Sequence, residues 1–233
     1  MPSPQAYVSE GMAGAEVNTF VRRVYNWMVL GLAITGVLAL LVSSSVSLIR
    51  SIAGNPVVFF GLIIGELVLV VALSAGINRM QAATATFLFL LYSALNGLTF
   101  SVIFAGYTQA SIASTFFITA GTFGVMSLYG YTTKKDLTSW GSLFFMGLIG
   151  IIIASVVNIF VHSSAIYWVI TYCGIFIFVG LTAYDSQRIK KMALGGFGDE
   201  QAEQKGAVIG ALRLYLDFIN MFLLFLRIFG RRR

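Results

Sequence analysis

Charged residues are scarce in this sequence: 15 Lys and Arg and 9 Asp and Glu make up 10% of its 233 residues. A soluble domain carries about 25% charged residues, because its surface must face water. The hydrophobic share is 58% and the mean hydropathy is +0.88. These values exclude a water-soluble globular enzyme, and they exclude a disordered chain, which would be rich in charge and poor in apolar residues. The composition indicates a chain that folds in a lipid bilayer.

Cysteine and histidine are nearly absent, since Cys173 and His162 are the single residues of each type. One cysteine cannot form an internal disulfide, and one cysteine with one histidine cannot build an ordinary zinc site. We therefore expect no cofactor. Residues 1–20 are polar and small and lack the short apolar core of a signal peptide. We expect them to form a polar N-terminal tail, followed by a first span that inserts by itself.

Long apolar runs predict the fold class. A membrane-spanning helix needs about 20 apolar residues. Seven runs of suitable length lie near 26–49, 57–76, 82–105, 110–131, 141–161, 166–186 and 207–229. The connections are short except for 187–206, so no soluble domain fits between the runs. We predict an all-α, polytopic membrane protein in which residues 21–233 form one domain of seven transmembrane helices.

Basic residues predict the orientation, because Lys and Arg are enriched in cytoplasmic connections. Arg50 is the single basic residue on one side before the C-terminus. The other side holds nine: Arg22, Arg23, Arg79, Lys134, Lys135, Arg188, Lys190, Lys191 and Lys205. The N-terminus is therefore expected in the cytoplasm. The net charge of +6 indicates this topology and contact with anionic lipids rather than nucleic-acid binding.

The side of the C-terminus stays open at this point. If 207–229 crosses the bilayer, Arg231, Arg232 and Arg233 lie outside, against the distribution of the other basic residues. If the segment enters and returns, they stay inside.

Five ionisable residues lie inside the apolar runs, where each costs about 2.5–3.5 kcal/mol at the helix centre and so needs a partner, a cavity or a role. They are Glu66, Asp185, Arg213, Asp217 and Arg227. In the last run the polar residues share a face: at about 100° per residue, Asp217, Asn220 and Arg227 lie within about 40° of Arg213. Such a stripe is typical of a helix that faces the protein interior or a water-filled path. The alternative is a structural pair of Arg213 with Asp217.

The two aspartates lie in consecutive runs, so they can be neighbours in the cytoplasmic half. Two carboxylates in a low-dielectric site cannot both ionise cheaply, so the pair would hold or share a proton, which a cation could replace. The alternative for Asp185 is an ordinary interfacial carboxylate that balances the basic residues after it. Glu66 has apolar helical neighbours, so it either takes up a proton in place or faces a cavity. We favour a cavity-lining role, with Arg79 as the candidate partner.

Four segments resemble the Bax inhibitor-1 (transmembrane Bax inhibitor motif) family, above all its bacterial inner-membrane members. They are YSALNGLTFSVIF, TAGTFGVMSLYGYTTKKDLTSWG, FVGLTAYDSQRIK and GALRLYLDFINMFLLFLRIFG. The resemblance runs from residue 20 to the C-terminus, and AYDSQ together with LYLDFIN is specific. Ser186 stands where the family more often has Thr. The resemblance implies seven spans, with the C-terminal helix surrounded by the other six.

The resemblance also implies a function, a pH-sensitive calcium leak across the inner membrane. In the family, paired aspartates on the last two helices are the proton sensor, and by motif these are Asp185 and Asp217. They are also the candidate contacts for calcium, which would be the permeant ion. A family arginine near the second span bridges to the first aspartate in the closed state, and Arg79 is its candidate here. Candidates for the pore lining are Glu66, Arg213, Asn220 and Arg227.

Two other functions remain open. Bacterial members of the family also associate with a membrane-bound AAA protease, which would make this chain a regulatory partner that binds through residues 1–20. An intramembrane aspartyl protease is suggested by Tyr184 and Asp185 followed by GFGD at 196–199. Those proteases need both aspartates inside separate helices, whereas Asp199 opens a solvated run. We therefore do not expect an enzyme.

Overall fold

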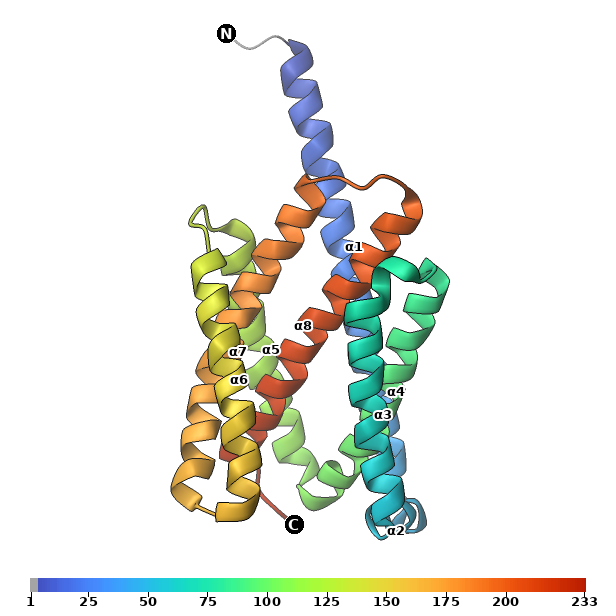
Figure 1. Ribbon diagram of the computed structural model, residues 1–233, viewed down its shortest axis with the longest axis vertical. Helices are drawn as coiled ribbons and strands as arrows, with labels where there is room; N and C mark the ends of the chain where they lie inside the picture. Colours follow the sequence, from blue (N-terminus) through green and yellow to red (C-terminus); the bar gives the residue numbers. More distant parts are fainter. Residues whose placement is uncertain (1–3) are drawn as a thin grey trace. The chain divides into compact units, whose positions relative to one another are not determined.

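The computed structural model describes residues 4–233, with side chains from residue 14 onward, and this part of the chain is helical. Seven of its helices are long and apolar enough to cross a membrane. The elements are α1 (Pro4–Ser43), α2 (Val46–Ala53), α3 (Pro56–Gly76), the short 3-10 helix η1 (Ile77–Arg79), α4 (Ala82–Gly106), α5 (Gln109–Thr132), α6 (Thr138–Val161), α7 (Ser164–Leu194) and α8 (Glu200–Phe229) (Figure 1). The predicted all-α class with seven spans is confirmed.

Several helix ends differ from the predicted runs. The run at 26–49 is divided, because α1 ends at Ser43 and α2 begins at Val46. The break falls in a serine triplet, where the Ser43 and Ser44 hydroxyls donate to carbonyls of the last turn of α1 (3.0 and 2.6 Å). Hydroxyls in such positions compete with the helical backbone pattern. Within the tail predicted at 1–20, the chain is helical from Pro4, and residues 1–3 lie outside the described residues.

The polar segment 187–206 is helical except for a short connection at 195–199. α7 continues to Leu194, and α8 begins at Glu200. Arg, Lys, Glu, Gln and Ala are good helix formers, so both helices extend beyond their apolar runs. The turn lies at Gly196, whose φ of +72° is a left-handed conformation that glycine adopts without steric cost.

The chain forms two compact units. Unit 1 contains the chain up to Gly106 and Ile189–Tyr215, and unit 2 contains Tyr107–Arg188 and Leu216–Arg233. In unit 1, α4 packs against α1, α2 and α3. The first half of α8 joins them through Tyr215, whose buried ring meets those of Phe89 and Tyr92 edge to face at centroid distances of 5.9 and 5.7 Å. The organisation of both units as one membrane domain stays a prediction.

Unit 2 consists of α5, α6, α7 as far as Arg188 and the second half of α8. The Phe218 ring of α8 lies 5.5 Å from each of the Phe116 and Phe123 rings of α5. α8 also approaches α7 closely, because a Cβ on Gly174 would lie only 2.8 Å from a methyl carbon of Leu224. Because Gly174 has no side chain, the backbones of α7 and α8 can pack tightly, as is common for helices in lipid.

The C-terminal helix is the most buried span. In its most apolar window 67% of residues are buried, against 6% in α3 and 0% in α6. It contacts α1 and α4 within unit 1, and α5 and α7 within unit 2. The predicted central position of the last helix is confirmed.

The last helix does not turn back. α8 is continuous over 30 residues, or about 45 Å. Beyond it, the Thr108 N–H donates to the Arg231 carbonyl (3.0 Å) and the Arg231 N–H donates to the Ser111 hydroxyl (3.2 Å), at the first turn of α5. The other end of α5 leads to Lys134 and Lys135. The C-terminus and these lysines therefore lie at opposite ends of α5, which favours a crossing over a re-entrant segment.

Candidate functional site: two buried carboxylates

Asp185 and Asp217 are both buried in unit 2, on α7 and α8. Asp185 is 8% exposed and Asp217 is 4% exposed. Aspartate is almost never this buried unless it is paired or has a role. The burial of Asp185 argues against the alternative that it is an ordinary carboxylate at the membrane interface.

Contacts with α5 give the relative depth of the two aspartates. The Ser127 and Ser186 hydroxyls are 3.0 Å apart, and the Phe123 and Phe218 rings are 5.5 Å apart. Phe123 and Ser127 are separated by one turn of α5, or about 6 Å along its axis. Because Ser186 and Phe218 directly follow the two aspartates in sequence, the aspartates lie within about one helical turn of the same depth.

The contact between α7 and α8 gives the same depth independently. Asp185 is 11 residues after Gly174 on α7, and Asp217 is 7 residues before its contact residue Leu224 on α8. Because α7 and α8 are antiparallel, moving toward the C-terminus along α7 and toward the N-terminus along α8 leads to the same end of the unit. The two offsets differ by 11 − 7 = 4 residues, or about 6 Å. Both measures place the carboxylates at a similar height in unit 2.

Buried polar residues surround Asp185 along α7. Thr182, Ser186 and Gln187 are 0%, 3% and 6% exposed. The Gln187 side-chain amide accepts a hydrogen bond from the Leu137 N–H (2.9 Å) and donates one to the Lys135 carbonyl (2.7 Å). This side chain therefore fixes the α5–α6 connection to the helix that carries Asp185. Neither Gln187 nor Ser127 was predicted from the sequence, although Gln187 is part of the AYDSQ segment.

Glu66 belongs to a polar cluster in unit 1. Its carboxylate accepts a hydrogen bond of 2.5 Å from the Thr99 hydroxyl of α4. Asn96 and Tyr92, which precede Thr99 on α4, are buried. The expected pairing of Glu66 with Arg79 is wrong, because ten residues of α3 between Glu66 and its end at Gly76 amount to about 15 Å. The hydrogen-bond partner of Glu66 is the Thr99 hydroxyl rather than Arg79.

Arg79 itself is exposed on η1 in unit 1. Asp185 lies in unit 2, so the role of Arg79 as the partner that bridges to this aspartate stays a prediction.

The residues of the polar stripe of α8 differ in burial, since Asp217 is only 4% exposed and the other three are more accessible. Arg213 and Asn220 are half-buried and Arg227 is exposed. On other faces Leu214 and Met221 are fully buried at 0%, whereas Leu216 and Leu223 are half-buried like Arg213 and Asn220. Burial therefore does not distinguish the stripe from the other faces of α8, and its contact with water stays a prediction.

Asn220 and Arg227 have partners in unit 2. The Asn220 amide donates to the Leu216 carbonyl one turn earlier (2.8 Å). The Arg227 guanidinium lies 5.1 Å from the centre of the Tyr167 ring on α7. Such cation–π contacts contribute about 0.5–1 kcal/mol at exposed sites, so the tyrosine orients this arginine.

The candidate calcium contacts are carboxylate oxygens, which calcium accepts as ligands. Across the described side chains, no group of three or more His, Cys, Asp or Glu could hold a metal ion. The role of Asp185 and Asp217 as calcium contacts stays a prediction.

Asp199, the second aspartate of the protease-like pattern, is exposed. Its carboxylate accepts a hydrogen bond from the Ala202 N–H (2.6 Å) at the start of α8, as an N-cap does. Asp199 belongs to unit 1 and the buried Asp185 belongs to unit 2. The capping role explains Asp199 without catalysis.

The chain is similar to known membrane proteins over almost its entire length. A family model described as "Inhibitor of apoptosis-promoting Bax1" matches residues 17–233. The inner membrane protein YbhL of Escherichia coli (strain K12) is 51% identical over 220 residues, which cover 94% of each chain. A protein of Borreliella burgdorferi is 49% identical over 216 residues, 93% of each chain. One of Deinococcus radiodurans is 43% identical over 217 residues, 93% of this chain and 92% of the relative.

Proposed function

Because this chain belongs to the Bax inhibitor-1 family, we propose that it is a pH-sensitive calcium leak channel gated by Asp185 and Asp217. The observation that carries the proposal is the burial of two carboxylates, 8% and 4% exposed, at a similar depth in unit 2. The printed name of the Escherichia coli relative supports a location in the inner membrane. The N-terminus would face the cytoplasm, where the nine basic residues of the connections gather.

The carboxylate pair supplies a charge that depends on pH. Coulomb interactions are much stronger in a low-dielectric interior than in water. Two carboxylates that lie close together in such an interior would share protons, so a change of pH would add or remove negative charge at one depth of the protein. Calcium is attracted by that charge and takes oxygen ligands. Protonation of the pair would therefore change both the affinity of this site for the ion and the packing of α7 and α8.

Other polar residues support a conducting path. Along α8, Arg213 and Asn220 are half-buried polar residues and Arg227 is exposed. Glu66 adds a carboxylate in unit 1, held by Thr99. Ionisable residues within membrane spans commonly mark ion pathways, because each is costly to bury without a role.

Calcium flux into liposomes tests the proposal. The purified protein is reconstituted with a calcium-sensitive dye inside the vesicles, and flux is measured between about pH 6 and pH 8. Asp185→Asn and Asp217→Asn each fix one side chain in a neutral form, so each should flatten the pH profile. Asp136→Asn is the matched control, since this aspartate is exposed at the start of α6. If both variants keep the wild-type flux and pH profile, the leak proposal is refuted.

A second candidate is a non-conducting regulatory partner of a membrane-bound AAA protease. The observation that favours it is that α1 begins at Pro4, while the match to the family model begins at residue 17. The helix therefore extends beyond the shared part of the chain and offers a segment for a partner. Deletion of residues 1–13 should then abolish co-purification of the protease and leave calcium flux unchanged. Equal co-purification with and without the segment would contradict this role.

A further inference from the structure

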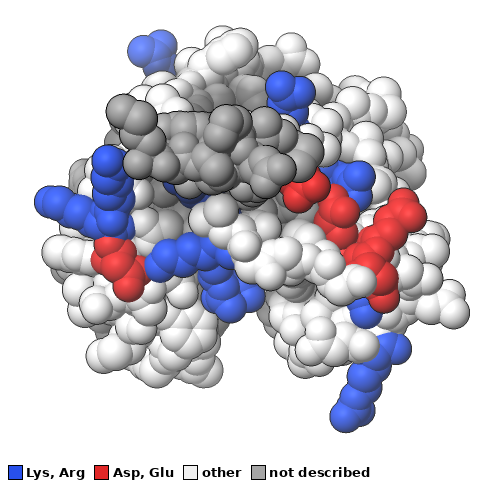
Figure 2. Space-filling model, turned by 90° about the horizontal axis from the view of Figure 1, so that it is seen from above, with Lys and Arg blue, Asp and Glu red and all other residues white. Residues whose placement is uncertain are grey.

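A cavity in unit 1 lies where α1 meets the connection between α7 and α8. Its volume is about 510 Å³, and its charged lining residues are Glu16, Arg23, Asp199 and Glu203. Binding sites for small molecules have volumes of about 300–1,000 Å³. Acidic and basic side chains gather on the face of the molecule seen in Figure 2. Neither Asp185 nor Asp217 lines this cavity, and the proposed leak does not use it.

One wall of the cavity is aromatic. The rings of Phe20 on α1 and Phe197 in the connection have centroids 4.7 Å apart, and both residues line the cavity. Phe20 is 3% exposed. Gly206 lies beneath the Phe197 ring, because a Cβ there would be 2.7 Å from a ring carbon. The absence of a side chain at this position lets Phe197 lie against α8 and shape the wall.

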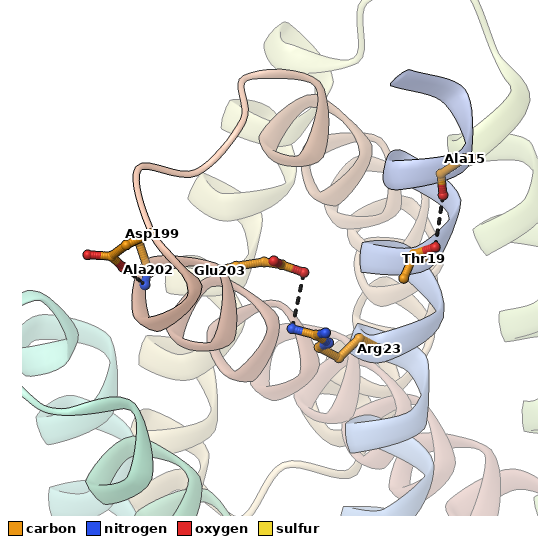
Figure 3. Close-up of polar contacts among 6 residues, drawn as sticks. All are labelled: Ala15, Thr19, Arg23, Asp199, Ala202 and Glu203. Carbon is orange, nitrogen blue, oxygen red and sulfur yellow. Dashed lines mark hydrogen bonds and ion pairs between the residues drawn. The ribbon is translucent and has the colours of Figure 1, made fainter. Parts of the chain in front are cut away.

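The charged lining has an excess of two negative charges: three carboxylates against one guanidinium, −3 + 1 = −2. Figure 3 shows Arg23 and Glu203 pointing toward one another from α1 and α8, with the guanidinium and carboxylate 3.1 Å apart. One oxygen of Asp199 accepts a hydrogen bond from the Ala202 N–H (2.6 Å). Glu16 and Asp199 are both exposed. Two carboxylates beyond the ion pair therefore face water at this cavity.

The carboxylates are distributed around the cavity rather than gathered at one point. Within residues 14–233, no three acidic, histidine or cysteine side chains are grouped so that they could hold a metal ion. Separated negative charges beside an aromatic wall match an elongated organic cation better. Its ammonium groups would meet the carboxylates, and its methylene chain would cover the phenylalanine rings.

We propose that this cavity binds an organic cation with two ammonium groups joined by an apolar chain. A free diamine and a pair of basic side chains in a peptide share this chemistry. Two positive charges on the ligand balance the excess charge of the lining, and the wall of Phe20 and Phe197 adds apolar and cation–π contact.

Calorimetric titration of the full-length protein tests the proposal. The protein is held in nanodiscs of zwitterionic lipid, so that ammonium groups do not bind the lipid itself. The probes are putrescine, the dipeptide Lys-Lys, and butanediol as the uncharged analogue of putrescine. Tighter binding of putrescine identifies a free diamine as the ligand, and tighter binding of Lys-Lys identifies a peptide. Both results support the site, whereas no saturable binding of either cation, or equal binding of butanediol, would overturn it.

Charge-neutral variants locate the binding. Glu16→Gln and Asp199→Asn should each weaken binding of the preferred cation by about five- to tenfold, because each removes one charge near the surface. Asparagine also caps helices, so Asp199→Asn keeps the start of α8 intact. Asp136→Asn removes an exposed aspartate outside the cavity and should leave binding unchanged. Wild-type affinity in both cavity variants, or displacement of the cation by equimolar calcium, would contradict the proposal.

Discussion

A close contact between α5 and α7, near Asp185, predicts the effect of one added methyl group. Gly130 of α5 faces the backbone of Ala183 on α7, and a Cβ on Gly130 would collide with the carbonyl group and Cα of Ala183. These are backbone atoms, so they cannot turn away as a flexible side chain would. Gly130→Ala must therefore push α5 and α7 apart, two residues before Asp185.

The size of the effect follows from two opposing contributions. Overpacking of a well-packed interior costs about 1–3 kcal/mol, and the collision with backbone predicts the upper end of that range. Alanine in place of glycine within a helix contributes about 1 kcal/mol in the other direction. The net loss for Gly130→Ala is then about 2 kcal/mol. For a chain of this size that loss lowers the melting temperature by about 4–8 °C.

A substitution on the same helix provides the control. Gly124 also lies on α5, but a Cβ there would have no neighbour within 4 Å. Gly124→Ala should be neutral or slightly stabilising, because it keeps the gain in helix propensity without a collision. Thermal unfolding in one detergent measures both variants. If Gly130→Ala melts at or above the temperature of Gly124→Ala, the close approach of α5 and α7 is refuted. If it melts lower, its calcium flux should also show a shifted pH profile.

Two further substitutions test polar contacts between helices. Thr99→Val removes the hydroxyl that donates to Glu66 and should cost about 1–3 kcal/mol, because the carboxylate keeps its burial and loses its donor. The control is Thr122→Val, which removes only a hydrogen bond within one helix. If the two variants have equal free energies of unfolding, the role of Thr99 as the donor to Glu66 is contradicted. Gln187→Leu leaves two backbone groups of the α5–α6 connection without their partner and should cost a similar amount, about 1–3 kcal/mol. Limited proteolysis of the α5–α6 connection measures the effect, with Gln109→Leu at an exposed position as the control. If the connection is cleaved equally fast in both variants, this role of Gln187 is refuted.

The number of spans could be predicted from the sequence because the length of an apolar run is a local property. The ends of α7 and α8 could not, since hydropathy reports the lipid-facing stretch and not where a helix stops. Arg, Lys, Glu and Gln continue a helix beyond the bilayer as readily as apolar residues do. The turn at 195–199 thus depends on glycine at Gly196, with its φ of +72°, rather than on polarity.

In the candidate site, too, some features could be predicted from the sequence and others could not. The position of Asp185 and Asp217 inside apolar runs predicted burial, and both are buried. The partner of Glu66 could not be predicted, because Thr99 is 33 residues away and lies on another helix. The bridge from Gln187 to Lys135 spans 52 residues and likewise leaves no local pattern. Contacts of this kind depend on how the helices pack, which periodicity within one helix does not report.

The central claim is that Asp185 and Asp217 act as one proton-sensitive unit. The most direct measurement is the pH profile of calcium flux in the double variant Asp185→Asn with Asp217→Asn, compared with each single variant. Groups that act as a unit are strongly non-additive. The double variant is expected to have the same flat profile as either single variant. Additive changes from two independent sites, or a wild-type profile in the double variant, would contradict it.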